Sequence, residues 1–472
     1  MKEKGAAWAL IATSVPMFMV AIDNLVVTNA LTTIADDLDT RQAGLQWVVN
    51  GYVLAFAGLL LAGAALGDRI GRRRVFLWGI GLFTAASAVC ALADSAGALV
   101  AARVVQGAGA AAVLPVSLTL AVASVGADRR PLAVGVWGGV NGLGIALGPM
   151  AGGLVTQGLD WHWIFWINVP IGLLALPLAR WAIAESKGAP RPLDVPGVAL
   201  VTGAVVAAVW GIVQFADGSA ALVRSLGGLA LAGLLLAAFG AWQRRTPTPL
   251  APLHLYRIRP FMLSNALALA MYFGVFGSIF FLAQFMQGPM GYSPVEAGLR
   301  TLPWTAAPMV VVPVASALVG RVGGGRLQAL GCLCQAGALG WLALICRPGL
   351  SYGAMVGAMI LAGVGMGLVF AANPATVIGS VAEHEHNLAS GVNNTVREFG
   401  GALGIAVLTA VYLHGGLRSA VLTGAAVVFL GAFAGLAIRP AATSSPGRPA
   451  SGPAPSARRS APSDRPAPSR LP

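Results

Sequence analysis

The sequence predicts an all-α polytopic membrane protein with fourteen transmembrane helices, arranged as two pseudo-symmetric six-helix bundles plus an inserted helix pair. Three observations predict this fold. The 472-residue chain is 57% hydrophobic and 10% charged, whereas soluble proteins are about 25% charged. Apolar stretches that reach the roughly 20 residues needed to cross a bilayer as a helix recur along the whole chain. A faint internal repeat relates the first half of the chain to the second.

Short polar loops separate the apolar spans, and the distribution of their basic residues predicts the topology. An even number of spans places both termini on one side. With that side cytoplasmic, inner segments hold 23 Lys and Arg and outer segments hold 5, as the positive-inside rule requires of a plasma-membrane protein. The spans are approximately residues 7–34, 44–66, 75–94, 97–125, 131–158, 163–184, 194–216, 222–243, 262–288, 297–319, 327–347, 352–380, 388–413 and 418–438.

The internal repeat predicts the domain organisation. A shift of 256 residues aligns residues 132–136 with 388–392 and pairs further glycines such as Gly107 with Gly363. Repeats of this kind are typical of transporters. The predicted units are an N-terminal six-helix bundle (1–185), inserted helices 7 and 8 (186–245), a C-terminal six-helix bundle (246–440) and a Pro/Ser/Arg-rich cytoplasmic tail (441–472) that is too polar to fold.

Two charged residues inside apolar spans are the candidate proton-coupling residues. Asp23 lies near the middle of the first span and Arg103 lies in the fourth. A carboxylate in mid-membrane costs about 2.5–3.5 kcal/mol on insertion scales, which indicates a function. Arg103 is about one turn from the outer end of its span, so snorkelling to the membrane surface is the alternative interpretation of that residue.

The loop after the second span is short and densely charged, and it is named the gating loop for the role that the family resemblance given below implies. It contains Asp68, Arg69, Gly71, Arg72 and Arg73 within a short, highly charged turn. Glycine permits a tight turn, and Asp68 can pair with an arginine or cap the next helix. The alternative is a plain positive-inside anchor.

A glycine-rich stretch of the fifth span is the candidate hinge between the halves. Gly144, Gly148 and Gly152 are spaced by four, so they form one bare stripe on a helix, and Gly153 adjoins it. Small residues let helices approach closely, and Pro149 removes a backbone hydrogen bond. Pure packing without a hinge is the alternative.

Polar and aromatic residues within the spans are candidates for a substrate cavity. Phe and Gln on one helix suit an amphipathic organic substrate, although aromatic residues also face lipid or core. Arg397 and Glu398 either face the cavity or belong to a mutually hydrogen-bonded helix start. The candidates are Asn29, Gln106, Asn141, Phe280, Gln284, Asn394, Arg397 and Glu398.

No cofactor or metal site is predicted. The four cysteines lie in apolar spans without metal-ligand spacing, and His384-Glu385-His386 stands in a loop without further ligands nearby. Zinc-hydrolase, nucleophile-elbow and phosphate-loop motifs are absent from the sequence, which argues against an enzyme. The basic residues serve topology, so no nucleic-acid partner is expected.

Together the motifs resemble those of the major facilitator superfamily. The gating loop, the Arg103-x-x-Gln106-Gly107 stretch and the 144–153 stretch resemble three signature motifs, and the last resembles that of proton-coupled antiporters. The fourteen spans resemble the multidrug branch of drug:proton antiporters. Leu25, Thr28 and Thr32 depart from the usual first-span motif, and the second-half loop at 320–326 lacks its Asp.

The resemblance implies a monomeric, proton-coupled antiporter that exports small organic molecules by alternating access. Protons would be the coupling ion, Asp23 the proton carrier, Arg103 a fixed charge and residues 144–153 the hinge and seal. The alternatives are a proton-coupled uptake symporter and an exporter of an endogenous metabolite.

Overall fold

The computed structural model describes residues 2–125, 129–187, 194–214, 219–247, 249, 254–347, 349–382 and 385–438. Within these ranges every regular element is a helix and no strand occurs. The described residues, which run from 2 to 438 with these gaps, form one compact unit. The predicted tail, 441–472, lies outside the described residues.

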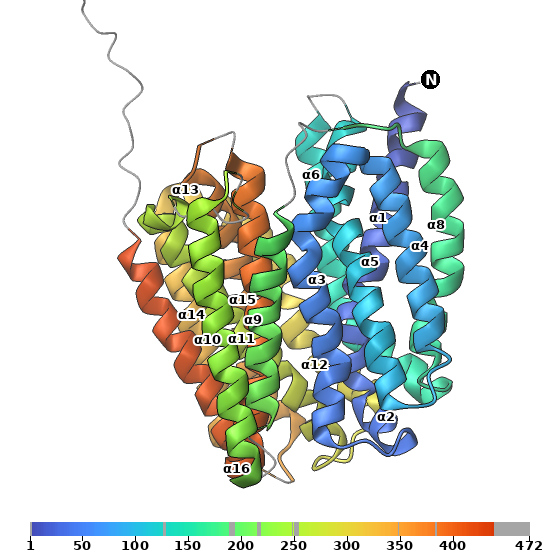
Figure 1. Cartoon of the computed structure of the whole chain (residues 1–472). Coiled ribbons are helices and arrows are strands. Elements are labelled where there is room, and N and C mark those ends of the chain that lie inside the picture. Colours follow the sequence, from blue (N-terminus) through green and yellow to red (C-terminus); the bar gives the residue numbers. More distant parts are fainter. Residues whose placement is uncertain are drawn as a thin grey trace, which may run out of the picture. The chain divides into compact units, whose positions relative to one another are not determined.

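The helices follow one another along the chain as the hydropathy pattern predicts (Figure 1). In the first half they are α1 (Lys2–Val26), η1 (Val27–Asn29), α2 (Leu31–Asp37), α3 (Gln42–Ile70), α4 (Arg72–Cys90), α5 (Ala96–Ala123), α6 (Arg130–Gly158), α7 (Trp163–Trp166) and α8 (Asn168–Ala182). The inserted pair is α9 (Val195–Gln214) and α10 (Ser219–Arg245). The second half contains η4 (Leu255–Arg257), α11 (Arg259–Gln287), α12 (Pro294–Thr305), α13 (Ala307–Val322), α14 (Gly324–Ile345), α15 (Tyr352–Gly379) and α16 (His386–Ala437).

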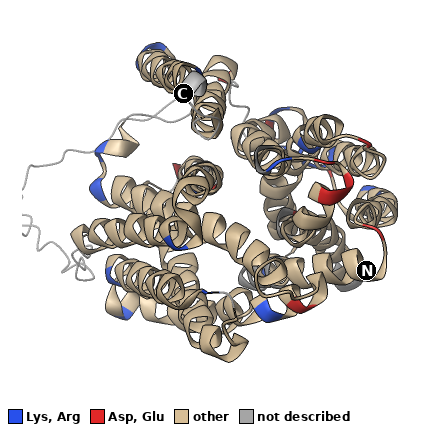
Figure 2. Cartoon of the chain, turned by 90° about the horizontal axis from the view of Figure 1, so that it is seen from below, with Lys and Arg blue, Asp and Glu red and all other residues tan. Residues whose placement is uncertain are grey.

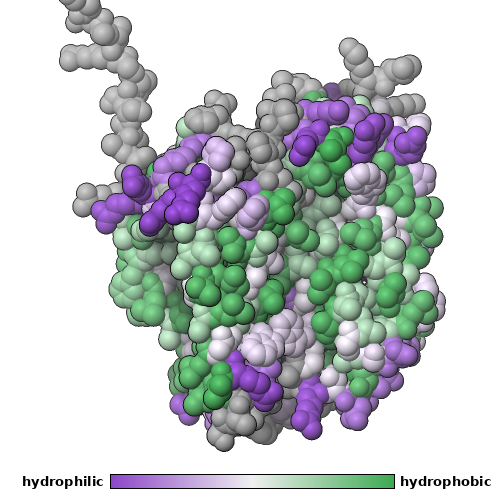
Figure 3. Space-filling view, in the orientation of Figure 1, coloured by the Kyte–Doolittle hydropathy of each residue, from purple (hydrophilic) through white to green (hydrophobic). Residues whose placement is uncertain are grey.

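The structure agrees with a fourteen-span membrane protein. Twelve helical stretches of the described residues are long and apolar enough to cross a bilayer. The 29-residue helix α6 is a further span, and α16 contains two spans separated by a non-helical residue, Gly416, with φ 69°. On the face shown in Figure 3, hydrophobic residues dominate the middle and hydrophilic residues gather toward both ends. Charged residues are sparse on the helices in Figure 2.

Proline and glycine account for the breaks at Ala306 and Gly416. The tenth span consists of α12 and α13, which are separated at Ala306 just before Pro308, near the start of α13. A proline there cannot donate the hydrogen bond that would continue α12. In α16 the positive φ of Gly416 is a conformation that residues with a Cβ rarely adopt.

Equivalent glycines of the repeat make equivalent contacts. A Cβ added to Gly107 of α5 would lie 2.4 Å from the Tyr52 carbonyl oxygen of α3, and one added to Gly363 of α15 would lie 2.5 Å from the Trp304 carbonyl oxygen of α12. Each glycine therefore lets its helix touch a neighbouring backbone. The positions of the domain boundaries near residues 185 and 245 stay a prediction.

The two halves meet along two sets of helices. α6 packs against α12, and α3 packs against α16. The inserted pair joins the second contact, because α10 packs against α9, which in turn packs against α3 and α16.

Candidate functional site

An ion pair between Asp23 and Arg103 lies at the centre of the candidate site. Asp23 is in the last turns of α1 and is fully buried, and Arg103 of α5 is 1% exposed. A guanidinium NH1 donates to Asp23 Oδ2 at 2.5 Å. The burial of Arg103 and its pairing with Asp23 argue against the snorkelling interpretation, which requires the guanidinium to reach the protein surface.

Three polar side chains complete the surroundings of this pair. Gln106, one turn after Arg103 on α5, donates to Asp23 Oδ1 at 3.0 Å, and Asn168 of α8 donates to the same oxygen at 3.0 Å. Both amides also donate to Ser87 Oγ of α4, at 2.9 and 3.0 Å. Hydrogen bonding is what makes the burial of polar groups tolerable. We call these five residues the Asp23 network.

Aromatic rings and a backbone carbonyl hold Arg103 from its other sides. Its Nε donates to the Val48 carbonyl at 3.3 Å, and NH1 also donates to Gln106 Oε1 at 2.6 Å. The guanidinium carbon lies 4.1 Å from the centre of the Tyr52 ring and 5.7 Å from that of Phe165. Cation–π contacts of this kind favour a buried guanidinium.

The chemistry open to the Asp23 network is the exchange of a proton. A buried ion pair balances its two charges, and removal of one partner leaves a costly uncompensated charge. Protonation of Asp23 would leave the charge of Arg103 unbalanced among apolar helices. The arrangement can therefore couple proton binding to a change in helix packing.

The gating loop is a single-residue turn between two helices. Gly71 has φ 122° and separates α3 from α4. Arg72 Nε donates to Asp68 Oδ1 at 2.9 Å, and its NH2 lies 2.7 Å from the same oxygen. The sequence allows two roles for Asp68, pairing with an arginine or capping the next helix, and in the structure Asp68 pairs with Arg72. Arg69 is in the last turn of α3.

Glu185, which follows α8, ties this loop to the end of the sixth span. Its Oε1 accepts a hydrogen bond from the Arg73 backbone amide at 2.9 Å. The carboxylate also lies 2.8–2.9 Å from the place where a Cβ on Gly71 would be. The turn therefore needs glycine for both its φ angle and its space. Sequence reasoning missed Glu185, a lone acid among basic residues.

The glycine stripe of α6 packs against α1 within the first half. A Cβ on Gly144 would lie 2.6 Å from Ala21 Cβ, and one on Gly152 would lie 2.2 Å from the Val26 carbonyl oxygen. Gly148 between them is buried. The glycine stripe is thus the surface against which α1, the helix that carries Asp23, packs.

The adjacent face of α6 meets the second half. A Cβ on Gly153 would lie 2.2 Å from the Pro294 carbonyl oxygen of α12. The Pro149 carbonyl accepts a hydrogen bond from Asn29 Nδ2 at 2.7 Å, and lies 2.4 Å from where a Cβ on Gly298 of α12 would be. We call this contact between α6 and α12 the α6–α12 seam.

Gln287, the last residue of α11, adds two hydrogen bonds between the halves next to this seam. Its Nε2 donates to the Asn29 carbonyl at 3.1 Å, and its Oε1 accepts from Thr32 Oγ1 at 2.8 Å. Asn29, a candidate cavity residue, is thus engaged in contact between the halves. Thr32 and Gln287 were not foreseen as a pair because 255 positions separate them.

Apart from Asn29, the candidate cavity residues divide into three groups, of which the first two have polar contacts. Gln106 belongs to the Asp23 network. Arg397 of α16 donates to Asn394 Oδ1 at 3.1 Å and to the Tyr272 hydroxyl, and its guanidinium lies 4.5 Å from the Tyr272 ring centre. Glu398 beside it is half-buried. Arg397 and Asn394 are one helical turn apart, and their hydrogen bond agrees with the interpretation in which polar residues of this helix bond to one another.

The remaining candidates are less engaged. Phe280 of α11 is 1% exposed and packs edge-on against Phe281 at 5.1 Å between ring centres, so it is a core residue in this conformation. Gln284 donates to the Phe280 carbonyl at 3.4 Å. Asn141 is half-buried on α6.

Sequence reasoning also missed Ser87, Asn168 and Tyr52 as members of the site. Asn168 is a polar residue within the sixth span, which was the only available signal. In the part of the chain that the structure describes, which excludes His384, no cluster of three or more His, Cys, Asp or Glu is arranged to hold a metal ion.

Comparison with known proteins places this geometry in a family. Residues 13–405 match the model of the Major Facilitator Superfamily. The chain is 34% identical to the tetracenomycin C resistance and export protein of Streptomyces glaucescens over 86% of this chain and 76% of that protein. It is 37% identical to the cephamycin export protein of Amycolatopsis lactamdurans, over 87% of this chain and 86% of that protein. The crystal structure of the human organic anion transporter MFSD10 superposes with a TM-score of 0.62 at 16% identity, covering 91% of this chain and 99% of that one, which supports the fold.

Proposed function

The chain belongs to the Major Facilitator Superfamily, and from this premise we propose that it is a proton-coupled antiporter that exports small organic molecules, antibiotics among them. The observation that carries the proposal is the buried Asp23–Arg103 ion pair. Relatives named for tetracenomycin C and cephamycin export support the substrate class. We further propose that the protein works as a monomer in the plasma membrane with both termini in the cytoplasm.

Asp23 is the proton carrier of the proposed cycle. In the deprotonated form it balances Arg103 and accepts hydrogen bonds from Gln106 and Asn168. Proton uptake removes one charge of the pair and weakens these charge-assisted bonds, which are about twice as strong as neutral ones. α1, α5 and α8 are then free to rearrange around the protonated acid.

Movement of the halves follows from the position of α1. The helix that carries Asp23 also packs against the glycine stripe of α6, and the other face of α6 forms the α6–α12 seam. A shift of α1 is therefore transmitted to the contact between the halves. α3 and α16 form the second contact, where Thr395 Oγ1 donates to the Ala57 carbonyl at 3.4 Å. Alternating access would open these two contacts in turn.

The gating loop stabilises one of the two states. The Asp68–Arg72 pair and the Arg73–Glu185 bond join α3, α4 and the segment after α8 at one end of the first half. Their exchange for other partners would accompany each cycle. The polar group of Arg397, Asn394 and Glu398, beside the Tyr272 ring, is the part of the interior best suited to contact an amphipathic substrate.

The energetics suffice for drug export. One proton moving inward at about 150 mV releases roughly 3.5 kcal/mol. A tenfold substrate concentration ratio across the membrane costs about 1.4 kcal/mol, so the energy of one proton sustains a substrate gradient of a few hundredfold.

The test begins with an antibiotic panel in a pump-deficient bacterial host, which identifies an exported compound. Purified protein in proteoliposomes is then assayed for movement of that compound under an imposed pH gradient. We expect movement against the direction of proton flow and its loss when a protonophore collapses the gradient. Undiminished transport without the gradient, or movement in the direction of proton flow, would contradict the proposal.

A further inference from the structure

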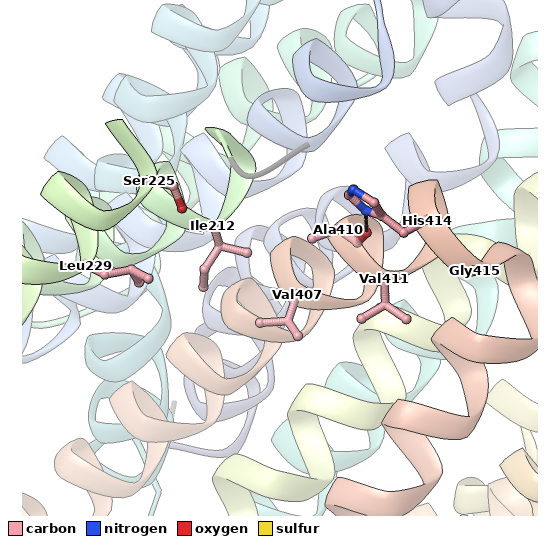
Figure 4. A pocket seen from close by; sticks show the side chains of 8 residues that line it. All are labelled: Ile212, Ser225, Leu229, Val407, Ala410, Val411, His414 and Gly415. Carbon is pink, nitrogen blue, oxygen red and sulfur yellow. Dashed lines mark hydrogen bonds between the residues drawn. The ribbon is translucent and has the colours of Figure 1, made fainter. Parts of the chain in front are cut away.

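A groove of the described residues lies away from the Asp23 network, between the inserted helix pair and α16 (Figure 4). Its volume is about 480 Å³, within the roughly 300–1,000 Å³ typical of small-molecule pockets. Ile212 of α9, two residues of α10 and five of α16 line it. The full lining is Ile212, Ser225, Leu229, Val407, Ala410, Val411, His414 and Gly415.

Helix packing explains why a groove forms here. α9 and α10 touch closely, since a Cβ on Gly228 would lie 2.7 Å from Gly211 Cα. α9 packs against α16 as well, so α9 forms the floor and α10 and α16 form the walls. α10 carries many exposed apolar side chains, among them Val223 and Leu234, so the groove adjoins a surface that faces lipid.

Ser225 is the polar group that points to a ligand. The residue is fully buried, yet its hydroxyl has no hydrogen-bond partner in the protein. An unpartnered buried polar group costs about 1–3 kcal/mol, and no bulk water is present within a bilayer to satisfy it. A bound molecule with a hydrogen-bond acceptor would remove that cost.

The polarity of the groove runs in one direction. Ser225 lies nearer than Leu229 to the start of α10, and His414 lies one to two turns from Val407 toward the end of the first helix of α16. Figure 4 shows Ser225 and His414 on opposite sides of the groove, both toward the upper edge of the view, with Leu229, Val407 and Val411 below them. The polar end is the one toward the last residues of α9 and the first residues of α10, where both predicted spans end.

From this gradient we propose that the groove binds a phospholipid of the bilayer, with an ester carbonyl at Ser225 and an acyl chain along the aliphatic wall. The direction matches a lipid whose esters lie at the boundary and whose chains run toward the membrane centre. Apart from Ser225, His414 and Gly415, the lining is aliphatic, which suits a flexible chain better than the flat ring systems that aromatic side chains stack against.

The test uses phosphatidylglycerol that carries a diazirine in one acyl chain, mixed into proteoliposomes of the full-length protein. After illumination, mass spectrometry locates the labelled peptides. We expect labelling of the 407–415 segment that saturates with the probe and is displaced by unlabelled phosphatidylglycerol.

Three variants make the test specific. Ser225→Ala should lower the labelling about three- to tenfold, as expected for one lost hydrogen bond. Ala410→Trp fills the groove and should lower it at least tenfold. The matched control is Leu234→Trp, at an exposed position of α10 outside the groove, and should change nothing.

Two outcomes would overturn the assignment. Labelling that does not saturate, or that is unaffected by Ala410→Trp, would show only contact with the general lipid annulus. Labelling that an exported antibiotic displaces and phosphatidylglycerol does not would assign the groove to substrate instead.

Discussion

The α6–α12 seam allows a prediction with a matched pair of adjacent residues. In Gly153→Ala the added Cβ would start 2.2 Å from the Pro294 carbonyl oxygen, whereas ordinary contact begins at 3.4 Å. The difference, 3.4 − 2.2 = 1.2 Å, is the distance by which α6 and α12 must separate. Because backbone lies on the other side, no side-chain rotation can relieve the clash.

The control is the neighbouring glycine. In Gly152→Ala the added Cβ would also start 2.2 Å from a carbonyl oxygen, but that oxygen belongs to Val26 of the same half. Both substitutions therefore create the same clash, and only Gly153→Ala places it between the halves. Gly142→Ala is a second control, because a Cβ there meets nothing within 4 Å. It shows the effect of replacing a glycine of α6 by alanine without a clash.

The magnitude follows from the cost of overpacking, which is about 1–3 kcal/mol. Applied only to the state in which the seam is closed, this cost shifts the equilibrium toward the state with an open seam by about 5- to 150-fold. Gly152→Ala should lower the stability of the protein by a comparable amount with a smaller shift, because its clash reaches the seam only indirectly, through α1.

The assay measures how fast a cysteine at the seam reacts with a membrane-impermeant maleimide added from the predicted outer side. Thr32→Cys, in a background without the four native cysteines, places the thiol opposite Gln287. We expect labelling at least fivefold faster with Gly153→Ala than with Gly152→Ala. Equal rates in the two variants would refute the assignment of the seam.

Three further predictions concern the network, the gating loop and the tail. Arg103→Lys keeps the charge but cannot reproduce the several hydrogen bonds and ring contacts that the guanidinium makes at once. Turnover in proteoliposomes should therefore fall at least tenfold. Turnover within twofold of the native protein would count against the role of the Asp23 network. Asp68→Asn should lower turnover while substrate binding at equilibrium changes less than twofold, because the Asp68–Arg72 pair lies in the gating loop; impaired binding with normal turnover would place it in the cavity. Removal of residues 446–472 should leave export unchanged at equal membrane level, and loss of export would give the tail a role.

Much of the fold could be predicted from the sequence because bilayer-spanning helices must be long and apolar. Most spans match the helices closely, but the first is divided among α1, η1 and α2 and the sixth between α7 and α8. The break at Gly416 falls in the short connection between the last two predicted spans. The division of the tenth span at Ala306 was not foreseen, although Pro308 is its local cause. A proline within an apolar span often bends a helix without ending it, so the sequence alone does not distinguish these outcomes.

The candidate site was less predictable, because its contacts join residues far apart in the chain. The cost of an intramembrane charge singled out Asp23 and Arg103, but not their contact across 80 positions. Asn168 looks like any other polar residue in a span. The spacing of the α6 glycines predicted a bare stripe but not its neighbour, and only the structure distinguishes Gly152, which faces α1, from Gly153, which faces α12.

Asp23→Asn tests the central claim, that Asp23 carries the coupled proton, most directly. Asparagine keeps the size of the side chain and a hydrogen-bonding oxygen for Gln106 and Asn168, but it cannot exchange a proton. The measurement is substrate-induced proton release by protein in proteoliposomes, with membrane insertion and substrate binding verified in parallel. We predict a variant that inserts and folds but releases no protons on substrate addition, and release of native size from it would contradict the account.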